Sequence, residues 1–418
     1  MCMAKIEPKT LKGFRDFLPP EQIARARFIA TIQASFETFG FDPLETPALE
    51  YAETLTGKYG DEGDKLMYRF RDNGDRDVAL RYDLTIPLAR VVAMNGELKK
   101  PWRRYQIAPV WRAENTQKGR YREFYQADAD IVGSTNPLAD AEILALAGST
   151  LTRLGVKDFE IRVNDRRLLD AFFDTEKIDT AKRIDVLRAM DKFAKIGESG
   201  VADELAKAGI DASAVKNILK AVVSNEIPEG SELEKIITLA REMNPDLKIS
   251  FDFSIARGLD YYTGLIFETV LTSAPAYGSV LSGGRYDNLV GMFSNREVPA
   301  VGMSIGLDRL LSALAELKLI DTVSTTTKAL VINMDESLQS DYLRMVSELR
   351  TAGINTALYY ESGDMGKQLK YASDRGIRYA VIYGIDEAKE GKVVIKDLST
   401  GEQKTSNFKN ITKEFSIK

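Results

Sequence analysis

Charged side chains alternate along two strand-like runs within residues 102–133, on either side of a polar loop that contains Gly119. Successive side chains of a strand point to opposite faces, so each run should present its polar residues on one surface. These residues are Arg104, Gln106, Arg112 and Glu114 on the first run, and Gln126, Asp128 and Asp130 on the second. The pattern predicts a β-hairpin with cations on one strand and carboxylates on the other. Such a surface suits a ligand that is anionic at one end and cationic at the other.

Three arginines stand in distant segments where they could meet on one phosphate group. Arg112 follows the first strand of the hairpin, Arg257 lies in the loop-like stretch ARGLDYY, and Arg309 is near the start of an expected helix. A guanidinium binds phosphate oxygens through two parallel hydrogen bonds, so the three together could hold a triphosphate. Any one of them taken alone is more typical of ordinary protein surface.

Carboxylates at Asp83, Asp128 and Asp130 point to a cationic partner. A buried carboxylate needs a positive charge or hydrogen-bond donors. An ammonium ligand would serve, as would Mg²⁺, which prefers oxygen ligands. Structural ion pairs with nearby arginines are the alternative.

The glycine-rich segment SGGRYDNLVG at 282–291 could hold a phosphate or form a tight β-turn. It matches neither a P-loop nor a dinucleotide-binding fingerprint, because the spacing of its glycines differs from both.

Composition limits the chemistry that is available. The chain has 418 residues, a net charge of −5, one cysteine and no histidine. Catalysis by a histidine base and a cysteine metal cluster are therefore excluded. The net charge disfavours general nucleic-acid binding but leaves room for local basic patches. No apolar run is long enough to cross a bilayer, and the first residues do not resemble a signal peptide, so we expect a cytosolic protein.

The elements that would position these residues follow from periodicity. Helices are expected at about 21–38, at 85–97 with Thr85 as the N-cap, and at 136–154. Residues 166–245 have few strand formers and helical spacing, which predicts a helical insertion, after which strand composition returns. Beyond a linker at 320–327, strands alternate with helices, which predicts a small sheet with parallel pairing.

Four segments, in order along the chain, resemble the signature motifs of class II aminoacyl-tRNA synthetases, and in particular of the histidyl-tRNA synthetases. GFDPLETPALE resembles the first class motif, the hairpin the second, and PAVGMSIGLDRL the third. RGLDYYTGLIFE at 257–268 and SGGRYDNLV resemble two motifs specific to the histidine family. LRYDLT and REFYQADADIVG are similar to the eukaryotic and archaeal-type branch, in which a tyrosine such as Tyr125 replaces a bacterial-type histidine.

The resemblance implies an α+β catalytic domain with an antiparallel six-stranded sheet, a helical insertion and a C-terminal α/β anticodon-binding domain. The expected limits are 1–165 and 246–322 for the catalytic domain, 166–245 for the insertion and 328–418 for the anticodon-binding domain. It also implies ATP as a substrate, Mg²⁺, L-histidine, tRNA(His) and a homodimer joined through the first motif.

Roles are implied residue by residue. Arg112, Arg257 and Arg309 would be catalytic; Arg112, Glu114, Arg120 and Arg309 would bind ATP; Asp83, Thr85, Gln126, Asp130, Tyr261 and Tyr262 would bind histidine; and Gln117, Arg120, Lys367 and Lys370, with Gln368, would contact tRNA. Asp128 receives no role, because the resemblance favours Asp130 as the partner of the imidazole.

Alternatives to an active ligase remain. A non-catalytic relative could sense histidine or bind RNA, although such proteins tend to lose the catalytic arginines and the C-terminal module, both of which this chain keeps. The absence of histidine also raises the hypothesis that the protein can be made during histidine starvation. Removal of histidine by engineering and drift in a small genome are rival explanations.

Overall fold

A large sheet forms the centre of the larger part of the chain in this computed structural model, which describes residues 6–56, 66–224, 226–256 and 261–415. Six strands pair antiparallel in the order β5-β6-β11-β10-β9-β7, and the short strands β1 and β8 add parallel pairs at the two edges. The expected six-stranded antiparallel sheet is therefore confirmed, with two short additions. The bounds are β1 Asp42–Pro43, β5 Trp102–Trp111, β6 Glu123–Val132, β7 Phe159–Asp165, β8 Ile249–Phe251, β9 Leu265–Leu271, β10 Ser279–Arg285 and β11 Ala300–Gly306.

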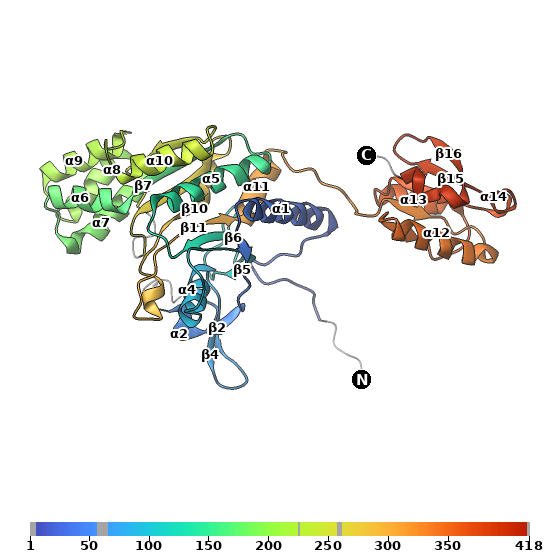
Figure 1. The fold of residues 1–418 in the computed structure, drawn as a ribbon, viewed down its shortest axis with the longest axis horizontal. Coiled ribbons are helices and arrows are strands. Elements are labelled where there is room, and N and C mark those ends of the chain that lie inside the picture. Colours follow the sequence, from blue (N-terminus) through green and yellow to red (C-terminus); the bar gives the residue numbers. More distant parts are fainter. Residues whose placement is uncertain (1–5, 57–65, 225, 257–260, 416–418) are drawn as a thin grey trace. The chain divides into compact units, whose positions relative to one another are not determined.

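The two faces of the hairpin β5–β6 have different environments, as the alternation predicts. Ala127, Ala129 and Ile131 are fully or almost fully buried in a core that also contains Ile143 and Leu144 of helix α5. Helices α1 (Pro19–Thr38), α5 (Pro137–Arg153) and α11 (Leu307–Glu316) contribute to that core (Figure 1). The polar residues of β6 lie on the other face, where a pocket opens.

A smaller sheet in the order β2-β4-β3 packs with helix α2, which in turn contacts α4. The segment between β4 and α4 and the first residue of α4 line the pocket. The bounds of these elements are β2 Leu49–Tyr51, α2 Ala52–Leu55, β3 Arg69–Arg71, β4 Asp77–Leu80 and α4 Thr85–Met94. The prediction that Thr85 caps α4 is wrong. Thr85 is the first helical residue, and the Asp83 carboxylate accepts the hydrogen bond from the backbone N–H of Ile86 at 3.0 Å.

The paired glycines form neither a phosphate loop nor a tight turn, because Ser282 to Arg285 lie inside strand β10, and the turn in this segment comes after the strand, at Asp287 and Asn288. A β-carbon at Gly283 would come within 2.2 Å of the backbone oxygen of Gly302 on the adjacent strand. A β-carbon at Gly284 would lie 2.8 Å from the Tyr262 ring. The glycines therefore let neighbouring backbone and pocket side chains approach the middle of the sheet.

Helices occupy the segment expected to be an insertion. They are α6 Arg166–Thr175, α7 Thr180–Asp191, α8 Phe193–Lys207, α9 Ala212–Val223 and α10 Glu232–Met243, and α8 is kinked at Gly197. Short 3₁₀ helices η1 Pro275–Tyr277 and η2 Val290–Met292 flank the strand β10. None of the described helices has the length and hydropathy needed to span a membrane.

The described chain divides into two compact units, one made mostly of residues up to Ile320 and the other of residues from Asp321 onward together with Phe17–Arg27. The second unit has a five-stranded sheet, β13-β12-β14-β15-β16. Its parallel pairs β12–β13 and β12–β14 are those the sequence predicts, whereas β15 and β16 pair antiparallel. The bounds are β12 Ala329–Val331, η3 Glu336–Leu338, α12 Gln339–Thr351, β13 Thr356–Leu358, α13 Met365–Asp374, β14 Tyr379–Ile382, α14 Ile385–Glu390, β15 Lys392–Asp397, β16 Gln403–Asn407 and η4 Phe408–Phe415.

Candidate active site

A pocket of about 440 Å³ lies against the polar face of the large sheet. Strands β6, β9, β10 and β11, the segment before α4 and the start of α11 all contribute to its lining. Ten of the residues selected from sequence line it: Asp83, Thr85, Arg112, Glu114, Arg120, Gln126, Asp130, Tyr261, Tyr262 and Arg309. Arg257 lies outside the described residues.

Aromatic rings hold the arginine of the hairpin at one end of the pocket. The Arg112 guanidinium lies over the Tyr82 ring, 4.4 Å from its centroid, and 5.1 Å from that of Phe124. Its Nε donates to the backbone oxygen of Tyr82 at 3.2 Å, and the Tyr82 hydroxyl donates to Glu114 at 3.0 Å. These contacts fix the orientation of the guanidinium and the nearby carboxylate. Both are therefore positioned to recognise a charged, planar ligand.

Arg309 enters the same pocket from the first turn of α11. Its Nη1 donates to the backbone oxygen of Ser279 on β10 at 2.6 Å. The neighbouring Asp308 is tied to the backbone N–H of Tyr125 at 2.7 Å and to Arg15 at 2.6 Å, which joins this helix end to β6. Two cationic side chains from separate elements thus line one pocket, as the sequence predicts.

A buried arginine on the neighbouring strand β5 pairs with the acidic strand β6. Arg104 of β5 and Asp130 of β6 are directly opposite in the sheet register, and Arg104 Nη2 lies 2.6 Å from Asp130 Oδ2 with both side chains buried. The Tyr286 hydroxyl also donates to Asp130. Burial and the nearby Asp130 carboxylate raise the pKa of Tyr286 well above its ordinary value, so the hydroxyl stays protonated.

Asp128 lies between Gln126 and Asp130 on the same face of β6. It is 1% exposed, and burial raises the pKa of its carboxyl group to about 7. The guanidinium of Arg104 opposes that rise, whereas the carboxylates of Asp130 and Asp83 add to it. A hydrogen bond from Gln126 Nε2 to Ser304 Oγ at 2.6 Å ties this strand face to β11.

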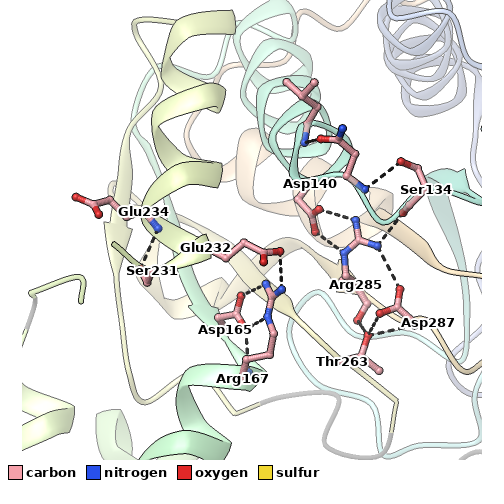
Figure 2. A network of polar contacts seen from close by, with 12 residues as sticks. Ser134, Asp140, Asp165, Arg167, Ser231, Glu232, Glu234, Thr263, Arg285 and Asp287 are labelled. Carbon is pink, nitrogen blue, oxygen red and sulfur yellow. Dashed lines mark hydrogen bonds and ion pairs between the residues drawn. The ribbon is translucent and has the colours of Figure 1, made fainter. Parts of the chain in front are cut away.

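A buried ion pair supports the aromatic wall of the pocket (Figure 2). Arg285 at the end of β10 bonds both carboxylate oxygens of Asp140 on α5, at 2.9 and 2.5 Å, and approaches Asp287 at 3.2 Å. Asp287 in turn accepts from the Thr263 hydroxyl at 2.7 Å. The backbone N–H of Thr263 donates to the Arg285 carbonyl at 2.8 Å. This network fixes the chain directly after Tyr262, whose pKa burial raises to about 12.

The tip of the hairpin contacts the end of α11. Lys118 Nζ lies 2.6 Å from Glu316 Oε2 and 5.0 Å from the centroid of the Tyr277 ring. Gln117 and Arg120 form an isolated β-bridge across the tip, and both side chains are exposed. The two residues expected to contact tRNA therefore lie on a solvent-exposed loop, and the contacts of Lys118 with Glu316 and Tyr277 hold that loop in place.

In the second unit, the candidate RNA contacts differ from one another. Lys367 and Lys370 on α13 are exposed. Gln368 is 2% exposed, and its amide makes hydrogen bonds to both the backbone N–H and the carbonyl of Asn333, at 2.9 and 2.7 Å. The prediction that Gln368 contacts RNA is wrong, because its buried amide group already bonds to the chain after β12.

Sequence reasoning missed several pocket residues. Tyr82, Tyr286 and Ser304 line the pocket and make the contacts described above. Tyr82 stands directly before Asp83, and Tyr286 lies within the glycine-rich segment, so proximity to selected residues was a usable signal. Ser304 lies within the segment PAVGMSIGLDRL, but only the pairing of β11 with β6 shows that it stands opposite Asp128.

Comparisons with known proteins cover both units. The profile of the histidyl-tRNA synthetase family matches residues 13–310, and that of the anticodon binding domain matches residues 328–417. A histidine–tRNA ligase of Rhodopirellula baltica is 43% identical over 420 residues, covering 95% of each chain. That of Clostridium tetani is 42% identical over 433 residues and covers 98% of each.

The fold agrees with this match. The crystal structure of histidyl-tRNA synthetase from Nostoc sp. PCC 7120 superposes with a TM-score of 0.88 at 35% identity, covering 98% of this chain and 99% of that one. The sequence profile, the full-length relatives and the fold give the same answer. The chain belongs to the histidyl-tRNA synthetase family.

Proposed function

We propose that this protein attaches L-histidine to tRNA(His) in two steps, first forming histidyl-adenylate from ATP and then transferring the histidyl group to the 3′ end of the tRNA. The observation that supports this most directly is that one pocket is lined both by arginines and by carboxylates. Family membership over both units adds the expectation of a tRNA partner.

In the first step the histidine carboxylate attacks the α-phosphorus of ATP, a bond forms from carboxylate oxygen to phosphorus, and pyrophosphate leaves. The attacking group is already ionised, so a chain without histidine needs no protein base. Catalysis then depends on positioning and on stabilising phosphate charge. We assign the α-phosphate to Arg112, the γ-phosphate to Arg309 and the adenine amino group to Glu114, with Arg120 as a further contact to ATP. Arg257 would act on the α-phosphate.

The other end of the pocket would hold histidine. Asp83, Thr85 and Gln126 are assigned to the α-ammonium group, and Asp130, Tyr261 and Tyr262 to the wall around the imidazole. The Tyr262 hydroxyl remains protonated at neutral pH because its pKa is about 12, so it can donate a hydrogen bond. A pocket with buried polar groups discriminates strongly against apolar analogues, which would leave those groups unpaired.

Mg²⁺ would enter with ATP. No cluster of three or more aspartate, glutamate or cysteine side chains suited to a metal ion occurs among the described residues. The carboxylates that line the pocket fit an Mg²⁺ ion bound through one or two protein carboxylates, with substrate phosphates and water as its other ligands. The ion would neutralise phosphate charge, and the side chains named above would orient the reacting groups.

In the second step a ribose hydroxyl of the tRNA attacks the carbonyl carbon of the adenylate, and AMP leaves. Gln117 and Arg120, exposed on the hairpin tip, are assigned to the acceptor end. Lys367 and Lys370 on α13 are assigned to the anticodon region because both are exposed cations in the unit that matches an anticodon binding domain.

We further propose a homodimer formed through the segment around β2. Leu49, Tyr51 and Phe70 of the small sheet are 40%, 53% and 48% exposed, which is unusual for large apolar side chains clustered on one sheet. Sedimentation equilibrium should give twice the chain mass, and Tyr51→Glu should shift the population toward monomer. A wild-type monomer at micromolar concentration would contradict the proposal.

The decisive test of function is histidine-dependent exchange of pyrophosphate into ATP, followed by charging of tRNA(His). An active ligase should show both, and Arg112→Ala should abolish the exchange while circular dichroism stays unchanged. A histidine sensor or an RNA-binding relative would bind its ligand without exchange. Absence of exchange in the wild-type protein would therefore refute the proposed function.

A further inference from the structure

The segment of residues 11–16 lies across the base of the hairpin tip. A turn, in which the backbone N–H of Phe14 donates to the carbonyl of Leu11 at 3.0 Å, brings Gly13 against Arg122. The Gly13 carbonyl accepts the backbone N–H of Arg122 at 3.0 Å. A β-carbon at Gly13 would lie 2.7 Å from Arg122 Cγ, and the φ of +90° at this position also favours glycine. The segment therefore contacts the hairpin at a position that glycine fits best.

The same contact leads to the part of the pocket that we assign to ATP. The backbone N–H of Arg112 donates to the Arg122 carbonyl at 2.8 Å, and Arg122 Nε donates to the carbonyl of Glu114 at 3.1 Å. Gly13, Arg122 and Arg112 are thus connected in a row by backbone hydrogen bonds. The segment of residues 11–16 is thereby joined to two of the residues that we assign to ATP.

Arg15 of this segment joins the hairpin to helix α11. Its guanidinium carbon lies 3.2 Å from the centroid of the Tyr121 ring, and its Nη2 lies 2.6 Å from Asp308 Oδ1. The other carboxylate oxygen of Asp308 accepts the backbone N–H of Tyr125 at 2.7 Å. The Asp308 side chain is 2% exposed, so its charge needs a nearby cation, and Arg15 supplies one. Both Tyr121 and Asp308 line the pocket.

These contacts lie next to a second arginine of the pocket. Arg309 follows Asp308 directly in the first turn of α11, and Gly306 before this helix offers no side-chain cap. The contacts of Asp308 therefore contribute to fixing the start of the helix. The hairpin tip also approaches Arg309, because a β-carbon at Gly119 would lie 3.5 Å from Arg309 Cγ. A change at Arg15 should thus affect Arg309 and the tip together.

We infer that Arg15 is a positioning residue for ATP, which holds the start of α11 and the base of the hairpin at a fixed separation so that Arg309 and Arg112 can bind one triphosphate together. Two guanidinium groups bind one chain of phosphates only if each lies within hydrogen-bond distance of its oxygens. Loss of Arg15 would leave the Asp308 carboxylate buried beside Arg309 without this cation, which favours a rearrangement of the helix start. The inference rests on the proposed function and adds to it a residue to which the sequence analysis gave no role.

The test measures pyrophosphate exchange by Arg15→Ala, with each substrate varied in turn. We expect the KM for ATP and the KM for pyrophosphate each to rise about tenfold, because the γ-phosphate that Arg309 holds becomes part of pyrophosphate. The KM for histidine should stay unchanged, since the residues assigned to histidine belong to other elements. A residue that only supports the fold would not separate the KM values in this way.

Arg103→Ala is the matched control. Arg103 of β5 makes an ion pair of similar length with Glu142, at 2.7 Å, and is likewise partly exposed, but it does not line the pocket. Its loss should leave all three KM values unchanged. Tryptophan fluorescence in urea shows whether each variant is folded. Arg15→Gln, which keeps a long side chain without the charge, replaces Arg15→Ala if the alanine variant is unfolded.

Two results would overturn the inference. One is an unchanged KM for ATP and for pyrophosphate in the folded Arg15 variant, and the other is an equal rise in the KM for histidine, which would indicate a general loosening of the site. Both results leave wild-type exchange, and with it the ligase function, intact. A wild-type protein without exchange would refute the function itself.

Discussion

Replacing Asp128 with asparagine should change how the stability of the ligand-free protein depends on pH. Burial raises the pKa of this carboxyl from its usual 3.8 to about 7, so between these values the folded state holds a proton that the unfolded state has lost. The stabilisation is complete below the unfolded pKa and is lost as pH rises through the folded pKa. The slope is about 1.4 kcal/mol per pH unit, or about 4 kcal/mol in all between about pH 4 and pH 7. Asparagine does not titrate, and its variant should escape this loss.

Tryptophan fluorescence can report unfolding of the catalytic unit specifically. Both tryptophans of the chain, Trp102 and Trp111, lie on β5, so their fluorescence in urea reports the catalytic unit alone. We subtract the free energy of unfolding of wild type from that of Asp128→Asn. This difference should increase from pH 5 to pH 7 and stay constant above pH 7. Asp75→Asn, at an exposed turn, should follow the wild type throughout. A difference between Asp128→Asn and wild type that stays constant from pH 5 to pH 8 would refute the reasoning.

Three further substitutions test the supports of the site. Arg285→Met should lower the free energy of unfolding by about 3–5 kcal/mol in the same urea assay, because it leaves Asp140 buried without its cation. Gly302→Ala should weaken histidine binding more than ATP binding, measured as KM values in exchange, because the new β-carbon would lie 1.9 Å from Asp130 Oδ1. Lys118→Ala should leave the urea midpoint unchanged, since its ion pair is exposed, but slow tRNA charging relative to exchange by freeing the hairpin tip.

Strand alternation was enough to predict which residues of the second hairpin strand face the pocket. Gln126, Asp128 and Asp130 do share the pocket face, and Ala127 and Ala129 do share the core face. The period of two is a local property of the backbone, so the sequence alone contains it. The helix at residues 19–38 and the helical insertion were predictable for the same reason, because their spacing is also local.

Partners across strands were not predictable in this way. Register decides that Arg104 meets Asp130 and that Ser304 lies opposite Asp128, and register depends on turn geometry and on the whole sheet. The glycines of β10 were misread for a related reason. Gly283 needs its small size only because Gly302 lies beside it, and no local pattern contains that neighbour.

The absence of histidine makes the raised pKa of the Asp128 carboxyl group easier to detect. A chain without histidine has no side chain whose ordinary pKa lies between 5 and 8 in the described catalytic unit. Asp128 supplies such a group by burial, with a pKa of about 7. An infrared titration of the carboxyl band can therefore be assigned without interference from protein imidazole. A band that titrates near pH 7 in wild type and is absent in Asp128→Asn would identify the group directly, whereas its persistence in the variant would contradict the assignment.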